Sequence, residues 1–312
     1  MDKKILNRMK GMIYGLIVGD CLGSRIEFSL KNNHPWVTEF QAGGPHALRK
    51  GDWTDDTAMT LAVMDSIVSC NGEVDSCDIM NNFCSWFRQG KYSSNGRCFD
   101  IGGATIRALN TYLTYGIKIK NDQSDSYGNG SIMRLAPTVI CDFLKNDYHY
   151  TQTLKVSNLT HENMYIQNIV EKMAYILFTH LKGEKTKIES SYKSRESASN
   201  SGLAGSTFNS ALWAFHTTDN FESGMIQAVN LGGDSDTIGA VYGQIAGAYY
   251  GYDAIPDKWK ENIINKQFVD NLFNSMIEIL DEKEKEKCIM NEKNFLRNFV
   301  KKAKLWMKPL KK

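Results

Sequence analysis

The fold of this chain is decided by two glycine ladders, 11-GMIYGLIVGDCLG-23 near the start and 239-GAVYGQIAGAYYG-251 near the end. Glycine recurs every four residues in each, and four residues turn an α-helix by about 400°, so the glycines form one narrow stripe. Glycine costs about 1 kcal/mol relative to alanine inside a helix, so such a stripe needs a compensating reason. A bare stripe lets another helix approach closely. We therefore predict that both segments are central, closely packed helices.

Each ladder has acidic residues at one end. The first leads into Asp20 near its C-terminal end, and the second begins just after Asp234-Ser235-Asp236-Thr237. We infer that both helices border a single acidic site. An alternative stays open, in which the glycines serve tight packing alone and no site is nearby.

The segments between the ladders are mostly helical in pattern. Apolar residues recur at helical spacing in three stretches, 57–69, 168–181 and 207–215. Five prolines in 312 residues favour long uninterrupted helices. Alternating strand patterns are scarce, and Thr151–Val156 is too short to weigh. The polar, Ser/Lys-rich stretch 182–201 is expected to be a surface loop or a mobile insertion.

Composition and charge exclude several classes of protein. The chain has 37 basic and 35 acidic residues, so it lacks the strong basic field of nucleic-acid binders. With 42% hydrophobic residues it is not intrinsically disordered. Seven cysteines include no C-x-x-C pair, which argues against a zinc ribbon. Reduced thiols in a cytoplasmic protein are the simplest interpretation.

The N-terminus imitates a secretion signal, because basic residues precede the apolar run Gly11–Gly19. The run then meets Asp20-Cys21 instead of a small-residue cleavage site. It is also far shorter than the ~20 residues that cross a bilayer. We predict a buried helix and no membrane association.

The strongest chemical signal is a pair of similar tetrapeptides, Thr54-Asp55-Asp56-Thr57 and Asp234-Ser235-Asp236-Thr237. Thr and Asp are favoured helix caps, so either segment alone could be structural. Four carboxylates brought together, however, must be neutralised by protons or by a cation. Oxygen ligands without sulfur or imidazole favour Mg²⁺, Mn²⁺ or Ca²⁺ over zinc.

Two other metal motifs fit the spacing poorly. An EF-hand beginning at Asp234 would need oxygen ligands where Ile238 and Ile245 stand, so only Gly239 fits. A phosphotransferase of the D-x-D-x-T type would need a hydrophobic strand directly before Asp234, where Gly232-Gly233 stand instead.

Three further segments are candidates for ligand contacts. Gly128-Asn129-Gly130-Ser131 is a turn signal that could also bring backbone N–H groups to an anion, and the residues from Ile132 on could begin a helix aimed at phosphate. Phe99-Asp100 stands beside a glycine pair. In Thr160-His161, the threonine could cap a helix and the histidine could contact a ligand, although a lone histidine is more often structural.

Taken in order, these segments resemble the ADP-ribosylglycohydrolase family. The matching pieces are GLIVGDCLGSRIEF, GDWTDDTAM, FDIGGAT, SYGNGSIMRLAP, THENMY, ALWAF, LGGDSDTIGAVYGQIAGAYYG and IPDKW, from about residue 11 to 259. The resemblance implies an all-α fold, a single compact orthogonal helical domain with two divalent ions, Mg²⁺ or Mn²⁺, in a central cleft. We expect this domain to span residues 1–300, with a Lys-rich tail at 301–312.

The resemblance also implies a role for individual residues. The family's metal ligands match Thr54, Asp55, Asp56, Asp234, Asp236 and Thr237. Its active-site glutamate matches Glu27, and the acidic residue proposed as a base in some bacterial members matches Asp100. Its ADP-ribose contacts match Ser126, Tyr127, Gly128, Asn129, Gly130, Ser131 and His161. Leu203 takes the place of an aromatic residue that many relatives have, where the family would stack on adenine.

The implied activity is metal-dependent hydrolysis of the glycosidic bond between ADP-ribose and a modified arginine or serine side chain. The implied partner is an ADP-ribosylated protein or a small ADP-ribosyl compound, and we expect a monomer. Two alternatives from other classes are a catalytically silent ADP-ribose binder or structural protein, and a metal-dependent phosphate-transferring enzyme. Retention of every acidic ligand argues against the silent relative.

Overall fold

Glycine meets glycine along the two helices at the centre of the fold, α1 (Lys3–Gly23) and α10 (Ser235–Tyr250). The helices are antiparallel, and their contact is the most extensive between any two helices of the computed structural model. A Cβ atom on Gly15 would lie only 2.2 Å from the carbonyl oxygen of Gly243, and one on Gly19 would lie 2.1 Å from that of Gly239. The predicted close approach is confirmed, because only hydrogen fits between the two backbones.

The structure describes residues 1–116 and 126–306, and within them the ordered elements are helices and short turns, with no strand. The predicted all-α fold is therefore confirmed. The other helices are α2 (Asp55–Ser69), α3 (Ser76–Gln89), α4 (Gly103–Tyr115), α5 (Ala136–Leu144), α6 (Thr151–Ser157), α7 (Met164–Leu181), α8 (Ala204–His216), α9 (Phe221–Val229), α11 (Asp257–Lys260) and α12 (Lys266–Trp306), with 3-10 turns at Ile132–Arg134 and Tyr252–Ala254.

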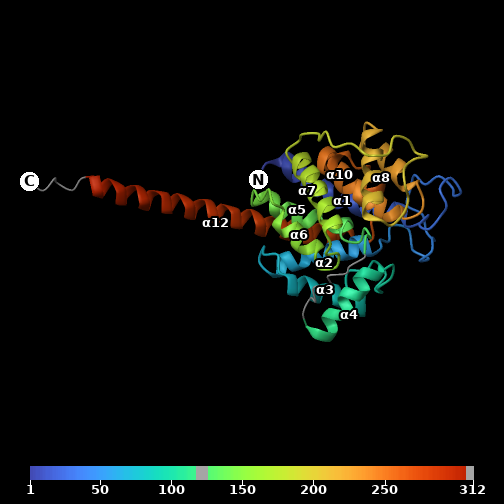
Figure 1. The fold of residues 1–312 in the computed structure, drawn as a ribbon, viewed down its shortest axis with the longest axis horizontal. Coiled ribbons are helices and arrows are strands. Elements are labelled where there is room, and N and C mark those ends of the chain that lie inside the picture. The colour runs from blue at the N-terminus through green and yellow to red at the C-terminus, as the bar shows by residue number, and fades with distance from the viewer. Residues whose placement is uncertain (117–125, 307–312) are drawn as a thin grey trace, which may run out of the picture.

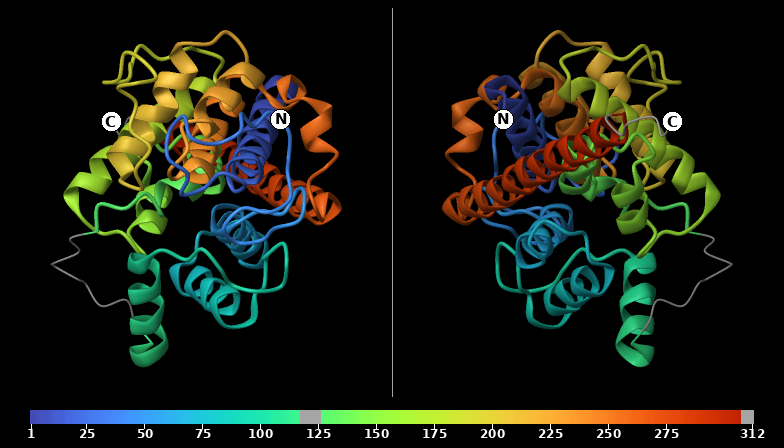
Figure 2. Two further views of the ribbon diagram at one scale, coloured as in Figure 1. Left: turned by 90° about the vertical axis from the view of Figure 1, so that its right-hand side faces the viewer. Right: turned by 90° about the vertical axis from the view of Figure 1, so that its left-hand side faces the viewer.

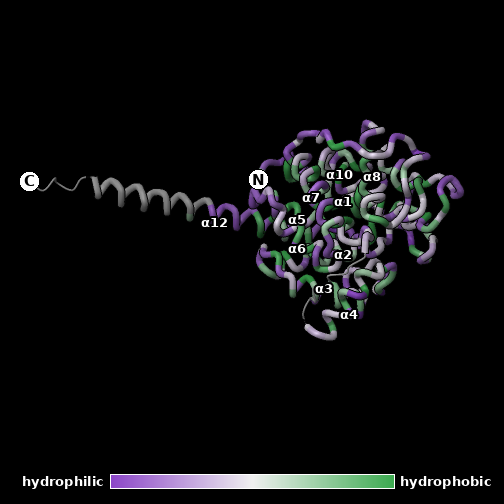
Figure 3. The backbone as a smooth tube through the Cα atoms, in the orientation of Figure 1, coloured by the Kyte–Doolittle hydropathy of each residue, from purple (hydrophilic) through white to green (hydrophobic). Residues whose placement is uncertain are grey.

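The central pair is covered on both sides. Helices α7, α8 and α9 pack against α10, while α2 contacts α1 and is itself covered by α3 and α12. Figures 1 and 2 show α3 and α4 beyond α2, on the side away from α10, and α12 extending away from the rest of the chain. Figure 3 shows hydrophilic residues along the outer loops and where α12 leaves the other helices. The α1–α10 pair therefore lies between two groups of helices.

The helices predicted from periodicity are present, with shifted ends. The stretch 57–69 lies in α2, 168–181 in α7 and 207–215 in α8, and each helix begins two to four residues earlier than its apolar pattern. Thr151–Val156 forms the helix α6 and no strand. The signal-like run Gly11–Gly19 is fully buried in α1, as predicted. Within the described residues, no helix is both long and apolar enough to span a membrane.

The polar stretch 182–201 forms a loop that is anchored at several points. The Ser190 hydroxyl donates a hydrogen bond of 2.6 Å to the carbonyl of Asn209 in α8, and the Arg195 guanidinium lies 4.9 Å from the ring centre of Trp36. The predicted tail begins inside α12, and its residues 307–312 lie outside the described part of the chain.

The buried imidazole of His180, between α7 and α10, makes the stability depend on pH. Burial lowers the pKa of His180 to about 4, whereas an unfolded histidine titrates near 6.5. The unfolded chain therefore takes up the proton first, and as the pH falls from about 6.5 to about 4 the free energy of unfolding drops by up to about 3 kcal/mol.

We expect His180→Asn to flatten this pH dependence, because asparagine cannot titrate but can still donate to the Ile245 carbonyl, which lies 3.0 Å from His180 Nδ1. Urea unfolding of both proteins at intervals across this pH window measures the difference. If the free energy of unfolding depends on pH equally in the two proteins, His180 is not the source of this pH dependence.

Candidate active site

The α2 helix begins at the end of α1 because Asp20 fixes its first residues. The Asp20 carboxylate accepts hydrogen bonds from the backbone N–H groups of Thr54 and Thr57, at 2.9 Å and 3.0 Å. It also accepts from both threonine hydroxyls, at 3.0 Å and 2.6 Å. These donors partly offset burial, which raises the pKa of Asp20 to about 6. Asp20 therefore sets the position of the TDDT segment.

Carboxylates from the starts of α2 and α10 lie close to one another and to Asp20. The carboxylate oxygens of Asp20, Asp56 and Asp236 lie within 4.8 Å of one another, and so do those of Glu27, Asp234 and Asp236. The Thr54 hydroxyl lies among them, 3.2 Å from Asp56 Oδ2 and 3.4 Å from Asp236 Oδ2. The prediction that both ladders border a single acidic site is confirmed.

The carboxylates at the starts of α2 and α10 have raised pKa values, because they are buried close to one another. Burial, reinforced by neighbouring carboxylates, raises the pKa of Asp55, Asp56 and Asp236 well above the usual range. Burial also raises the pKa of Asp234. Buried carboxylates of like charge must be relieved by protons or by cations.

The donor set fits hard divalent cations. Asp56 Oδ1 is buried and has no hydrogen-bond partner among the described residues, so one oxygen of a clustered carboxylate is left unsatisfied. The surrounding ligands are carboxylate and hydroxyl oxygens, a set that suits Mg²⁺, Mn²⁺ or Ca²⁺ better than zinc. The acidic clusters can therefore hold metal.

A second cluster joins Glu27 and Asp100 through His46. Nε2 of His46 lies 3.0 Å from Glu27 Oε2 and 3.4 Å from Asp100 Oδ1. Burial, followed by the charges of Asp100 and Asp234, raises the pKa of Glu27 to about 10. The backbone is strained around all three residues, because Phe28, Ala47 and Asp100 have φ values of 62°, 53° and 57°. Such conformations in residues other than glycine concentrate at functional sites.

The predicted substrate loop, residues 126–131, lies beside the acidic cluster, and we call it the Asn129 loop. Asn129 connects this loop to the acidic cluster. Its side-chain amide donates hydrogen bonds to Asp234 Oδ2 and, at 2.9 Å, to the Thr207 hydroxyl. Its backbone N–H donates to the Gly202 carbonyl at 3.1 Å and is therefore not free to bind an anion.

The residues that could begin a helix aimed at phosphate do not form an α-helix directly after the Gly128–Ser131 turn. The residues from Ile132 on form a 3-10 turn, and α5 begins only at Ala136. The backbone N–H of Ala136 donates to Gln244 Oε1 at 3.0 Å. The first turn of α5 is therefore covered by a buried side chain of α10.

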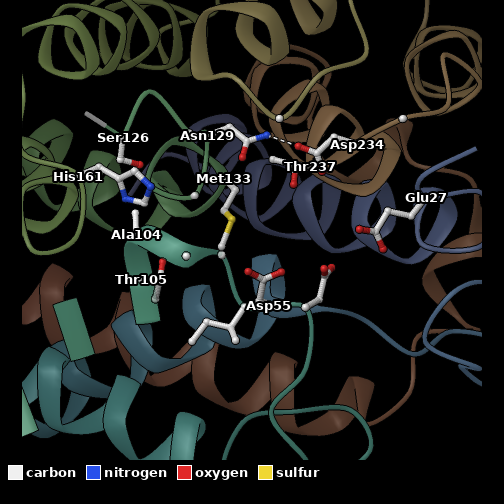
Figure 4. Close-up of a pocket in the computed structure, with 18 of the residues that line it drawn as sticks. Glu27, Asp55, Ala104, Thr105, Ser126, Asn129, Met133, His161, Asp234 and Thr237 are labelled. Atoms are coloured by element: carbon white, nitrogen blue, oxygen red, sulfur yellow. Dashed lines mark hydrogen bonds between the residues drawn. The ribbon is translucent and has the colours of Figure 1, made fainter. Parts of the chain in front are cut away.

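A cavity of about 520 Å³ lies between the acidic residues around Glu27 and Asp234 and the loop that carries Asn129. Figure 4 shows His161 and Ser126 at one end, Glu27 at the other, and Asn129 pointing toward Asp234 between them. The predicted residues that line the cavity are Glu27, Asp55, Asp100, Ser126, Gly128, Asn129, Gly130, His161, Asp234 and Thr237. Its volume is typical of small-molecule sites.

The remaining predicted residues do not line this cavity. Thr54, Asp56, Asp236 and Ser131 are buried beneath or beside it. Tyr127 and Leu203 are half exposed at its margin, where a bridge joins Gly128 to Leu203 and the Tyr127 ring meets that of Tyr165 edge-on at 5.3 Å.

Comparison with known proteins decides the family. A family model described as ADP-ribosylglycohydrolase matches residues 1–287. This chain belongs to the ADP-ribosylglycohydrolase family. One relative is the ADP-ribosylarginine hydrolase Tri1 of Pseudomonas putida (strain GB-1), which is 36% identical over 86% of this chain and 78% of its own length.

Other members of the ADP-ribosylglycohydrolase family agree with this assignment. Tri1 of Serratia proteamaculans (strain 568) is 32% identical over 91% of this chain and 82% of its own. The ADP-ribosyl-[dinitrogen reductase] glycohydrolase of Rhodospirillum rubrum is 30% identical over 81% and 89%. A solved structure described as an ADP-ribosylglycohydrolase-related protein complex has a TM-score of 0.75 at 32% identity and covers 89% of this chain and 100% of that one.

Three residues around the site were not among the predicted site residues. Asp20 had a signal in the sequence, because the first ladder leads into it, but its hydrogen bonds to α2 could not be read from spacing. His46 stands in an irregular segment without periodicity, and Arg134 is a fully buried charge that contacts the loop at Gly130. Nothing in the pattern of residues separates such a buried arginine from a surface one.

Proposed function

We propose that this protein is a metal-dependent hydrolase that releases ADP-ribose from modified arginine side chains. The observation that carries the proposal is the cavity itself, which joins the acidic cluster to the Asn129 loop and His161. The family and the names of its relatives support ADP-ribosyl glycohydrolase activity. The arginine linkage draws its support from the two relatives named ADP-ribosylarginine hydrolase.

Two divalent cations, Mg²⁺ or Mn²⁺, complete the site. The residues that would hold them are those that the family resemblance implies, Thr54, Asp55, Asp56, Asp234, Asp236 and Thr237, of which the acidic clusters contain Asp56, Asp234 and Asp236. Asp20 holds the α2 segment in place. When bound, the cations supply positive charge that polarises ribose hydroxyls and lowers the pKa of water. The protein supplies the spacing of the carboxylates, because α1 and α10 are in close backbone contact along their glycines and Asp20 of α1 holds the start of α2.

Glu27 and Asp100 move the proton. In the reaction the bond from the anomeric carbon to the arginine nitrogen breaks, and a bond to a water oxygen forms. The proton that the water loses passes to one of these two carboxylates, and the leaving nitrogen receives one. Their shared contact with His46 keeps the two carboxylates close together. Figure 4 shows Glu27 at the end of the cavity opposite His161.

His46 is expected to matter for turnover more than for substrate binding. His46→Phe keeps a ring beside Phe28 and Phe99 but removes the hydrogen bond to Glu27 and the close contact of the imidazole with Asp100. Loss of such a supporting contact should lower kcat roughly 10- to 100-fold. KM should change little, because the Asn129 loop and His161 are untouched. Steady-state kinetics of the two parameters checks this.

His46→Gln is the matched variant, because its amide can donate from a similar position. It should recover part of the kcat that His46→Phe loses. A similar loss of kcat and rise in KM in both variants would instead indicate a general disturbance of the site.

The decisive experiment measures release of free ADP-ribose from matched arginine- and serine-ADP-ribosylated peptides, with Mg²⁺ and then with EDTA. We expect metal-dependent release from the arginine peptide. Release from the serine peptide alone would overturn the linkage, and release in EDTA would overturn the role of the cations. No release from either peptide, together with binding of ADP-ribose in calorimetry, would indicate a silent binder.

We also propose that residues 1–300 act as one catalytic domain that includes the loop 182–201. The end of this loop supports the site directly, because the Asn200 carbonyl accepts a hydrogen bond of 2.9 Å from the backbone N–H of Asp234.

A cytoplasmic location is supported by the free thiols of the six cysteines whose side chains the structure describes.

A further inference from the structure

A buried arginine lies behind the substrate end of the cavity. Arg134 is fully buried, and its guanidinium lies 5.1 Å from the ring centre of Phe83. It donates hydrogen bonds to the carbonyl of Gly130 and, at 2.5 Å, to the hydroxyl of Thr160. One side chain therefore connects the Asn129 loop to the turn that carries His161.

Thr160 passes this contact on to His161. The Thr160 hydroxyl lies 2.8 Å from Nδ1 of His161, and both residues are buried. A guanidinium can only donate, so the hydroxyl oxygen accepts from Arg134 and keeps its own hydrogen for another acceptor. Among the described residues, Nδ1 of His161 is the acceptor that the structure provides for this hydrogen.

The direction of these hydrogen bonds determines where the imidazole carries its proton. If Nδ1 accepts from Thr160, the proton of a neutral ring must be on Nε2. The opposite tautomer would place two donors on the Thr160 oxygen and leave the hydroxyl hydrogen without this acceptor.

We propose that Arg134, acting through Thr160, holds His161 in the tautomer protonated on Nε2, so that His161 donates a hydrogen bond to a phosphate or ribose oxygen in the cavity. Arg134 and Thr160 are then positioning residues. The nature of the ligand rests on the proposed function, whereas the tautomer does not.

The surroundings of Nε2 agree with this role. His161 lines the cavity, and its ring lies against the loop at two glycines. A Cβ atom on Gly130 would lie 3.1 Å from His161 Cε1, and one on Gly128 would lie 3.6 Å from Nε2. The glycines thus leave room for the ring and for a ligand atom next to it.

The ring also stays neutral. Burial, together with the positive charges of Arg134 and Arg107, lowers the pKa of His161 to about 3. At neutral pH the imidazole therefore has one donor and one acceptor nitrogen, and the Thr160 contact decides which is which.

The test observes the imidazole directly, by two-bond ¹H–¹⁵N correlation spectra of the full-length ¹⁵N-labelled protein. The His161 signals are identified by their absence in His161→Gln. We expect a protonated Nε2 and a hydrogen-bonded, unprotonated Nδ1. In Thr160→Val the Nδ1 signal should shift to that of a free acceptor, whereas Thr160→Ser should keep the wild-type spectrum. Protonation on Nδ1 in the wild type would overturn the proposal.

Calorimetry with ADP-ribose and Mg²⁺ measures the consequence for binding. Loss of one ordered donor should weaken ADP-ribose binding about tenfold in Thr160→Val, and Thr160→Ser should restore it. Thr138→Val is the matched control, because Thr138 is also buried and its hydroxyl donates to the Leu135 carbonyl at 2.9 Å. Thr138 does not line the cavity. Thr138→Val should leave ADP-ribose binding unchanged.

The outcomes separate this proposal from the function on which part of it rests. An unchanged spectrum and an unchanged affinity in Thr160→Val would overturn the control by Thr160. If the protein has the Nε2-protonated tautomer of His161 but does not bind ADP-ribose, the role of Thr160 in setting the tautomer is supported and the proposed ligand is overturned. Arg134→Lys adds an independent variant, since lysine keeps the charge but cannot hold Gly130 and Thr160 together, and it should loosen the Nδ1 contact as Thr160→Val does.

Discussion

Asp236→Asn is expected to abolish release of ADP-ribose and, at the same time, to raise the melting temperature of the metal-free protein. Asp236 contributes a carboxylate to both acidic clusters, so its removal takes a ligand from each proposed cation. In the absence of cations, however, burial, reinforced by the neighbouring charges of Glu27 and Asp100, raises the pKa of Asp236 well above its usual range, so this carboxylate destabilises the folded state. Asparagine keeps the shape and removes that repulsion.

Thermal unfolding in EDTA and in Mg²⁺ separates the two effects. The wild type should gain stability on addition of Mg²⁺, and Asp236→Asn should gain much less. Asp142→Asn is the matched control, because Asp142 is also buried but accepts three hydrogen bonds, from Gln152 and Thr153. It should lose stability and keep its activity. Full turnover by Asp236→Asn would refute the metal site.

Gly243→Ala is expected to be among the most destabilising single substitutions in the chain. Its Cβ would lie 1.9 Å from the carbonyl oxygen of Gly15 and 2.1 Å from the carbonyl carbon. Backbone atoms cannot move aside as a flexible side chain does, so α1 and α10 must separate. Overpacking costs about 1–3 kcal/mol or more, which outweighs the ~1 kcal/mol that alanine gains in a helix.

Urea unfolding measures this loss, with Gly103→Ala as the control. A Cβ on Gly103, in α4, would meet only the end of the flexible Arg107 side chain, at 3.4 Å. The control should therefore keep or slightly raise the free energy of unfolding. Similar values for the two variants would mean that the central helices tolerate a wider spacing than the structure has.

The part of the fold that could be predicted is the part where a local sequence pattern, the repeated glycines, requires close packing against another helix. The ladders require close packing wherever they lie, and the flanking acidic residues indicated that their ends share a site. What periodicity could not supply was the pairing itself. Only the three-dimensional structure shows that Gly15 faces Gly243 and that Asp20 accepts hydrogen bonds from Thr54.

The site was predictable for residues within motifs and not for those that support them. Asp56 and Asp234 stand in tetrapeptides whose composition is itself a signal. His46 and Arg134 act through side-chain hydrogen bonds to distant residues, Glu27 and Thr160, and such partners leave no trace in local spacing. The sequence could not place the helix that follows the Gly128–Ser131 turn for a similar reason, because Gln244, which covers the start of α5, stands more than one hundred positions away.

The glycine contact also has a consequence for how the protein is made. The α1 helix leaves the ribosome long before its partner α10, which begins only at Ser235, so the central pair is a contact of very high sequence separation. Until α10 emerges, the bare stripe of α1 has nothing to pack against, and Asp20 and Asp56 lack Asp236. A nascent chain therefore cannot assemble a complete site until most of its length has been synthesised. Premature termination before that point yields an inactive product with an exposed central helix.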